Sequence, residues 1–181
     1  MIKIQTLLTT TVLLFGISGS GVADFKDGID AYQKGEYKTA FNEWEPLAEQ
    51  GDATAQLNLG VMYRNGEGVL KDDKEAVKWY LKAAEQGDAK AQYNLGLMYR
   101  NGEGVLKDYK EAVKWYLKAA EQGQADAQYN LGVMYANGKG VLKDLSKAKY
   151  WIKKAYENPD AGADAIERAK IVWNIYELWK Y

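Results

Sequence analysis

A stretch of 36 residues occurs three times in succession in this chain of 181 residues. The segments 51–86 and 87–122 differ at only four positions, and segment 123–158 is a looser copy in the same register. The third copy keeps the AQYNLG segment, a Met-Tyr pair, an NGxGVLKD loop and a late tryptophan. A fixed period of this length is typical of proteins that stack one supersecondary unit on the next. The repeat therefore predicts a stacked helical-repeat architecture.

Each copy is predicted to form two helices joined by a loop. In the first copy Asp52 is a natural N-cap, and Ala55, Leu59 and Met62 recur at the spacing of one helical face. Gly60 lies on the same side, where the missing side chain would let a neighbouring helix approach closely. The first helix of each repeat is thus expected to start at an aspartate and to bury one apolar face.

The loop and the second helix have equally clear signals. The NGEG segment breaks the first helix because its two glycines adopt positive φ without strain. We expect Val69 and Leu70, which follow, to turn back into the core. Asp72 and Glu75 have the spacing of a capping box at the start of the second helix.

The units at the two ends of the chain differ from the full copies. Residues 24–50 have the spacing of two shorter amphipathic helices and lack the NGEG loop. Residues 159–181 contain a helix predicted from about Asp164 to Lys180, apolar on more than one face. In the last full copy Gln124 replaces the N-cap aspartate. Terminal repeats are often atypical because they cover the ends of the stack, so both segments are expected to be caps.

The first residues have the pattern of an export signal. Residues 1–23 combine Lys3 near the start, a mostly apolar segment and small residues before Asp24. Because the apolar segment is shorter than the roughly 20 residues of a membrane span, we expect a cleaved secretory signal peptide. An uncleaved N-terminal anchor is the alternative. The mature chain is then predicted to be periplasmic or secreted, with no later segment that crosses a membrane.

Composition excludes several functions. The mature chain loses only Lys3 and carries 23 basic and 25 acidic residues, a net charge of −2. Near-neutral mixed charge argues against nucleic acid as a partner. The chain has no cysteine and no histidine, which removes disulfides, thiolate metal sites and the commonest general base. We expect no cofactor and no metal.

The repeat resembles the Sel-one-like repeat (SLR) family. The residues that carry the resemblance in the first copy are Ala55, Leu59, Gly60, Tyr63, Gly66, Gly68, Val69, Asp72, Ala76, Trp79, Ala83, Ala84 and Gly87. The resemblance implies an all-α fold, an α/α superhelical solenoid of Sel-one-like/tetratricopeptide-type helix-turn-helix repeats. Residues 24–50 look like a degenerate tetratricopeptide-like N-terminal helix pair. Proteins of this family are typically scaffolds or adaptors, often exported, that bind other proteins on the concave side lined by the first helices.

A cysteine-rich branch of the family has been associated with penicillin binding and β-lactamase activity. This chain lacks the cysteines of that branch. Ser146 and Lys149 do fit the S-x-x-K spacing in which a lysine activates a serine nucleophile, although the SDN and KTG partners are missing. Ser146 also occupies a first-turn position where serine is common and innocuous. We therefore expect no enzymatic activity, with a β-lactamase-like or cell-wall-fragment hydrolase as the alternative.

The candidate partner-binding residues come from the first helix of each repeat, beside its core face. They combine aromatic, apolar, amide and arginine groups, and Tyr and Arg are enriched at protein–protein hot spots. We expect the arginines and asparagines to be exposed, whereas the apolar residues could instead pack between repeats. The ligand is predicted to be a protein or peptide, and the chain a monomer. The predicted surface comprises Leu57, Asn58, Val61, Arg64, Tyr93, Asn94, Leu97, Arg100, Tyr129, Asn130 and Val133.

Overall fold

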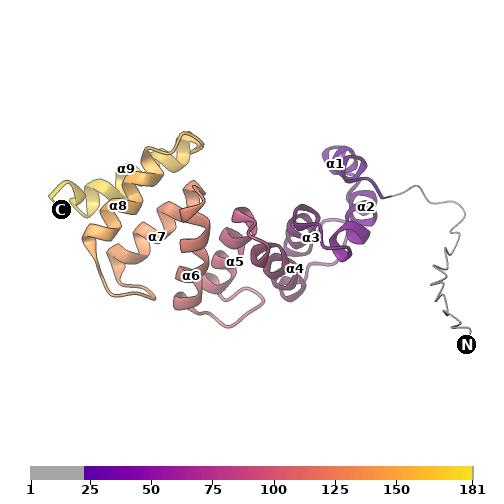
Figure 1. The fold of residues 1–181 in the computed structure, drawn as a ribbon, viewed down its shortest axis with the longest axis horizontal. Helices are drawn as coiled ribbons and strands as arrows, with labels where there is room; N and C mark the ends of the chain where they lie inside the picture. Colours follow the sequence, from indigo (N-terminus) through magenta and orange to yellow (C-terminus); the bar gives the residue numbers. More distant parts are fainter. Residues whose placement is uncertain (1–22, 181) are drawn as a thin grey trace, which may run out of the picture.

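The fold is a single row of antiparallel helix pairs. The structure, a computed structural model, describes residues 23–180, so the predicted signal peptide lies outside the described residues except for Ala23. Figure 1 shows the helices in one curved row, with α1 and α9 both at its upper edge. Within the described residues there are nine α-helices, one short 3-10 helix and no strand, which confirms the all-α class. The elements are α1 (Phe25–Gln33), α2 (Tyr37–Glu49), α3 (Ala53–Asn65), α4 (Asp73–Glu85), α5 (Ala89–Asn101), α6 (Tyr109–Glu121), α7 (Ala125–Asn137), α8 (Leu145–Tyr156), α9 (Ala163–Ile175) and η1 (Leu178–Lys180).

The helices begin and end where their capping residues predict. Asp52 and Asp88 each accept a hydrogen bond from a backbone N–H in the first turn of α3 and α5. Gln124 does the same for α7, so its amide oxygen takes over the aspartate's role. Gly66 and its counterparts end the first helices in the left-handed conformation, at φ 76° for Gly66. A side-chain cap at the N-terminus and a left-handed glycine at the C-terminus therefore fix the length of each first helix.

Only half of the predicted capping box forms. Asp72 accepts hydrogen bonds from the backbone N–H groups of Lys74 and Glu75, as an N-cap should. The reciprocal bond is absent because the Asp72 N–H donates to the carbonyl oxygen of Tyr63. The Glu75 carboxylate instead forms an ion pair with Lys78.

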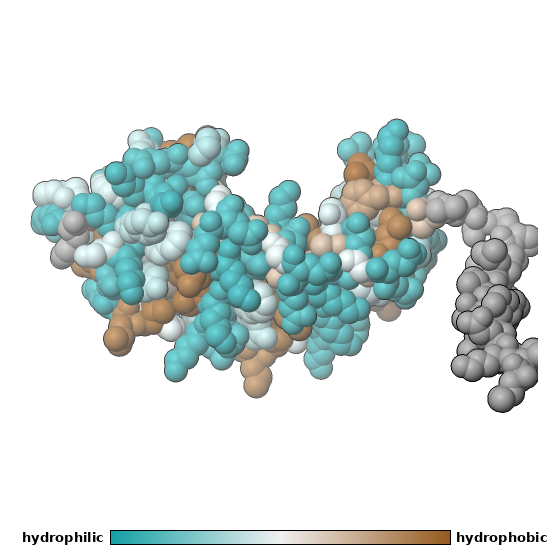
Figure 2. Space-filling view, in the orientation of Figure 1, coloured by the Kyte–Doolittle hydropathy of each residue, from teal (hydrophilic) through white to brown (hydrophobic). Residues whose placement is uncertain are grey.

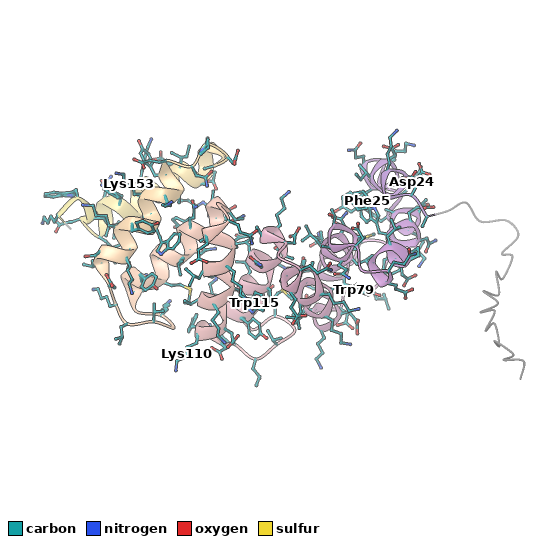
Figure 3. All side chains as sticks on the ribbon, viewed as in Figure 1. Asp24, Phe25, Trp79, Lys110, Trp115 and Lys153 are labelled. Atoms are coloured by element: carbon teal, nitrogen blue, oxygen red, sulfur yellow. The ribbon has the colours of Figure 1, made fainter. Side chains whose placement is uncertain are left out.

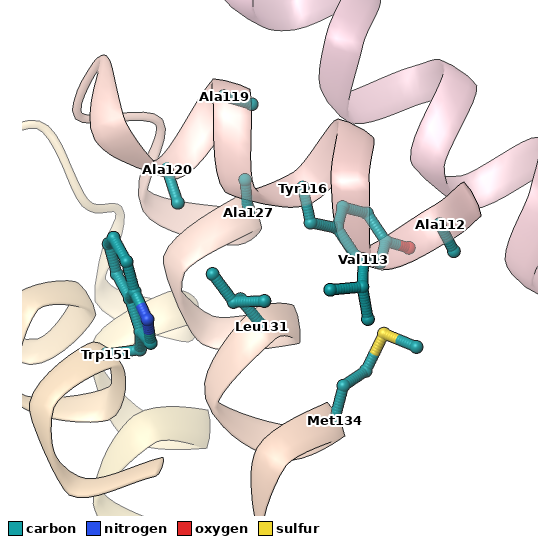
Figure 4. Close-up of a cluster of buried hydrophobic side chains, with 9 residues drawn as sticks. All are labelled: Ala112, Val113, Tyr116, Ala119, Ala120, Ala127, Leu131, Met134 and Trp151. Carbon is teal, nitrogen blue, oxygen red and sulfur yellow. The ribbon is translucent and has the colours of Figure 1, made fainter. Parts of the chain in front are cut away.

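A continuous core runs along the row between successive helices. One part of it, shown in Figure 4, gathers side chains from α6, α7 and α8, with Tyr116 and Leu131 fully buried. The predicted close approach at Gly60 is confirmed, because a Cβ there would lie 2.5 Å from the Tyr80 ring. The second helices also carry half-buried tryptophans at matching positions, Trp79 and Trp115, labelled in Figure 3. The aromatic residues thus form much of the packing between repeats.

Two sequence interpretations are wrong. Leu70 does not turn into the core: its side chain is 90% exposed, and Leu106 and Leu142 match it. In Figure 2 apolar groups protrude along the lower edge of the molecule, below the loops that follow α5 and α7 in Figure 1. The final helix is also shorter than predicted, because α9 ends at Ile175 and Glu177 then takes a positive φ of 48°.

Candidate functional site

The predicted partner-binding residues all lie on α3, α5 and α7, the first helices of the three repeats. None of the eleven is fully exposed. Leu57 and Asn130 are buried, and the other nine are half-buried. The structure therefore brings these residues to one type of position in each repeat, in the crevices between neighbouring helices.

The apolar members of the set belong partly to the core. Leu57, expected beside the core face, is 8% exposed and packs in the same cluster as Tyr80. Val61, Leu97 and Val133 are half-buried against core clusters that join their own repeat to the next repeat or to the C-terminal cap. These side chains contribute to packing between repeats, the alternative that the sequence left open.

The two tyrosines have different surroundings. The Tyr93 ring lies against the fully buried Tyr116, with 6.0 Å between ring centroids. Burial raises the pKa of Tyr93 above its ordinary value. The ring of Tyr129 is covered by Arg168 of the C-terminal helix α9, whose guanidinium carbon lies 5.1 Å from the ring centroid. Arg168 also pairs with Asp126 at 2.8 Å, which fixes the C-terminal cap on α7.

The arginines and asparagines are less exposed than the sequence indicates. Arg64 is half-buried and forms an ion pair of 3.0 Å with Glu103 of the following repeat. Arg100 donates to the side-chain oxygens of Asn130 and Asn101, each at 3.2 Å. Asn130 is 7% exposed, so the expectation that it faces solvent is wrong. Half-buried arginines with defined partners are well placed for recognition, because their side-chain entropy is already restricted.

An open depression lies where the N-terminal cap meets the first full repeat. Asn58 and Val61 of α3 face Phe25 and Ile29 of α1 across it, with Thr54 at its margin. The sequence interpretation treated the first helix pair only as a cap and missed its apolar contribution. The signal available in the sequence was Ile29, an apolar residue outside the helix face of Gly28 and Ala31.

A second set of residues missed from the sequence joins the repeats by polar contacts. Gln56, Gln92 and Gln128 occur at the same place in each copy and are each 4% exposed. The amide of Gln92 donates to the Ala84 carbonyl oxygen of the preceding repeat and accepts from Gln122. Their invariance within the three copies was the signal that could have revealed this role.

The residues of the alternative hydrolase are not arranged as a nucleophile and its base. Ser146 is exposed in the first turn of α8, where Asp144 is the N-cap. No hydrogen bond joins it to Lys149 in the part of the chain that the structure describes, and the Lys149 ammonium lies 5.9 Å from the Trp173 ring centroid. Among residues 23–180 no group of three potential metal ligands gathers, and no helix is long and apolar enough to cross a membrane.

Comparisons with known proteins identify the family. The Sel1 repeat model matches residues 53–88, 89–124 and 125–160, more than half of the chain. The chain therefore belongs to the Sel1 repeat family, the same family as the Sel-one-like repeats that the sequence resembles.

Solved structures share the fold. A Sel1 repeat protein from Oxalobacter formigenes is 39% identical, with a TM-score of 0.77 over 84% of this chain and 60% of that one. A protective antigen present in uropathogenic Escherichia coli strains, which displays an SLR fold, is 41% identical, with a TM-score of 0.72 over 75% of this chain and 30% of that one. Helicobacter pylori cysteine rich protein B is 26% identical, with a TM-score of 0.53 over 82% of this chain and 98% of that one.

One curated relative matches over a short segment. An exopolysaccharide production negative regulator of Rhizobium leguminosarum bv. viciae is 39% identical over 56 residues. That segment is 31% of this chain and 21% of the relative. The chain thus spans about a fifth of the regulator's length and 60% of the Oxalobacter protein's length.

Proposed function

We propose that this protein is an exported, non-enzymatic scaffold that binds a protein or peptide on the surface formed by α3, α5 and α7. The observation that carries the proposal is the repeated set of tyrosine, arginine and asparagine side chains on these helices, half-buried and held in place by neighbours. Pre-positioned groups of this kind lose little entropy on binding. Membership in the Sel1 repeat family, whose repeats generally mediate protein interactions, supports the same function.

The curated relative suggests a regulatory role only by analogy. Its likeness covers 31% of this chain, which supports a shared scaffold more than a shared process. We propose that the mature chain starts at Asp24, acts outside the cytoplasm and is a monomer. Sequencing the N-terminus of the protein recovered from the periplasm or the medium tests the cleavage site directly.

A photo-crosslinking experiment tests the binding surface. Lys90 is exposed on α5, one helical turn before Asn94, whereas Lys114 is exposed on the second helix α6. A photoreactive amino acid is placed at each position in the bacterium that encodes the protein. We expect a discrete adduct with another protein from position 90 and none from position 114. Equal labelling from both positions, or adducts from position 114 alone, would show that the first-helix surface is not the binding site.

The hydrolase alternative is tested with a chromogenic β-lactam. We expect no turnover, because Ser146 has no base in contact with it within the described residues. Turnover that Ser146→Ala abolishes would overturn the non-enzymatic assignment.

A further inference from the structure

The loop between the two helices of each repeat carries one residue that contacts the preceding repeat. In the first two repeats this residue is a glutamate. Glu67 accepts a hydrogen bond of 2.6 Å from the Tyr32 hydroxyl, and Glu103 accepts one of 3.0 Å from Arg64. The equivalent residue of the third repeat is Lys139. The chain therefore repeats a carboxylate contact twice and reverses its charge the third time.

We call the contact between segments 51–86 and 87–122 the first junction, and the contact between segments 87–122 and 123–158 the second junction. The two junctions have the same backbone geometry. Gly104 sits so close to the start of α4 that a Cβ would lie 2.2 Å from the Asp73 carbonyl oxygen. Gly140 has the same relation to the Tyr109 carbonyl oxygen at the start of α6, also at 2.2 Å. Because the loops dock alike, Lys139 has the same place relative to the start of α6 that Glu103 has relative to the start of α4.

The charges around the two junctions differ as a result. At the first junction Arg64 and Lys71 face Glu103 and Asp73, two positive and two negative groups. At the second junction Arg100, Lys107 and Lys139 are all positive, and Tyr109 replaces the aspartate. The N-cap aspartates Asp72 and Asp108 occur at both and cancel in the comparison. The net charge thus changes from zero to +3.

Two of the positive groups, those of Lys107 and Lys139, converge on the Tyr109 ring. The ammonium groups of Lys107 and Lys139 lie 5.0 and 5.7 Å from the centroid of the Tyr109 ring. A hydrogen bond with Lys107 and the charges of Lys107, Lys139 and Arg100 lower the pKa of Tyr109. Arg100 itself has only neutral amide oxygens as partners within the described residues, those of Asn130 and Asn101. We call Arg100, Lys107, Tyr109 and Lys139 the basic cluster.

The buried tyrosine hydroxyls of the two junctions also differ. At the first junction burial raises the pKa of Tyr80 to about 12, against the charge of Arg64 and a hydrogen bond with it. At the second junction the equivalent Tyr116 is fully buried, and its hydroxyl has no hydrogen-bond partner among residues 23–180. The second junction therefore differs from the first in its buried tyrosine as well as in its charges.

We propose that the basic cluster binds a carboxylate of an acidic peptide segment, which would occupy the place that Glu103 occupies at the first junction. The first junction shows that an arginine at this position pairs with a carboxylate, through one contact of 3.0 Å between Arg64 and Glu103. Hydrogen bonds between charged groups of this kind are roughly twice as strong as those between neutral groups. The inference rests on the proposed function and defines the chemistry of its ligand: a segment with Asp or Glu side chains laid across α5 and α7.

The binding test uses a fluorescein-labelled peptide of alternating glutamate and alanine, with the glutamine counterpart as the neutral probe. Fluorescence anisotropy with the mature chain at low salt should show at least tenfold tighter binding of the glutamate peptide. Lys139→Glu supplies the missing carboxylate from within the chain and should weaken that binding at least tenfold. Lys34→Glu, an equal charge change at an exposed turn after α1, should leave it within about twofold.

A transplant provides the converse experiment. Asp73→Tyr combined with Glu103→Lys gives the first junction the residues of the second and should raise the stoichiometry from one peptide to two. Equal affinity for both peptides, or equal effects of Lys139→Glu and Lys34→Glu, would overturn the proposal. Binding of inorganic phosphate without binding of the glutamate peptide would overturn it as well, because the cluster would then be a phosphate site.

Failure of this inference is distinguishable from failure of the proposed function. A crosslinked partner from position 90 together with no preference for the glutamate peptide would leave the scaffold assignment intact and remove the carboxylate site. Peptide binding that Lys139→Glu abolishes, without any adduct from position 90, would keep the carboxylate site and show that the ligand does not extend along α5 to position 90.

Discussion

At single positions, the closeness of the helix pairs depends on two glycines under two tyrosine rings. Gly60 lies under Tyr80 in the first repeat, and Gly96 lies under Tyr116 in the second, where a Cβ would be 2.6 Å from the ring. Both tyrosines are almost completely buried and cannot move aside without disturbing the core clusters around them. Small residues here are a packing requirement, since the rest of each helix tolerates ordinary side chains.

Substitution of one of these glycines should therefore be costly. We expect Gly96→Ala to lower the free energy of unfolding by about 1–3 kcal/mol, the usual effect of overpacking a buried contact. Gly162→Ala is the control for the steric clash, because nothing lies within 4 Å of a Cβ there and φ is −65°. Since Gly162 is the N-cap of α9, where alanine is disfavoured, this control should still cost less than about 1 kcal/mol. Urea unfolding followed by circular dichroism measures both. Equal midpoints for the two variants would contradict the tight approach of α5 and α6.

Substitution of Leu106, in contrast, should leave the stability of the protein almost unchanged. Its side chain is 91% exposed at the tip of the loop before α6. We expect Leu106→Gln to change the free energy of unfolding by less than about 0.5 kcal/mol, as for other surface substitutions. A loss of several kcal/mol in the same urea assay would support the expectation from the sequence that the leucine of this loop turns into the core.

At the scale of the helices, sequence reasoning succeeded where the signal is local. Aspartate caps and left-handed glycines depend on a few neighbouring residues, so the roles of Asp52 and Gly66 follow from the sequence alone. The end of α9 and the direction of Leu70 depend on which surface is available nearby, and both were predicted wrongly. At the candidate site the helix face was predictable. The burial of Asn130 was not, because it results from a contact with Arg100, which belongs to another repeat. Side-chain contacts between repeats cannot be derived from spacing within one.

The buried glutamines join one repeat to the next, and their loss should be measurable. Gln92→Met keeps the side-chain volume similar but removes two hydrogen bonds, the one donated to the Ala84 carbonyl oxygen and the one accepted from the Gln122 amide. We expect a loss of about 1–3 kcal/mol in the free energy of unfolding, because two hydrogen bonds of about 0.5–1.5 kcal/mol each are lost. Gln50→Met, at an exposed helix end, is the control and should change stability by less than about 0.5 kcal/mol.

At the scale of the whole molecule, each helix packs almost entirely on the helices before and after it in the chain, apart from the C-terminal cap, where α9 also contacts α7. Stability in such a stack is close to a sum of repeat and nearest-neighbour terms. The chain without residues 87–122 should therefore still fold. In that shortened chain Gln128 would meet the Ala84 carbonyl oxygen in place of that of Ala120, its acceptor in the full chain. We expect a cooperative helical protein with a lower urea midpoint and an m-value about a quarter smaller, because less surface is exposed on unfolding. A shortened chain without helical circular dichroism would show that the repeats depend on contacts beyond their neighbours.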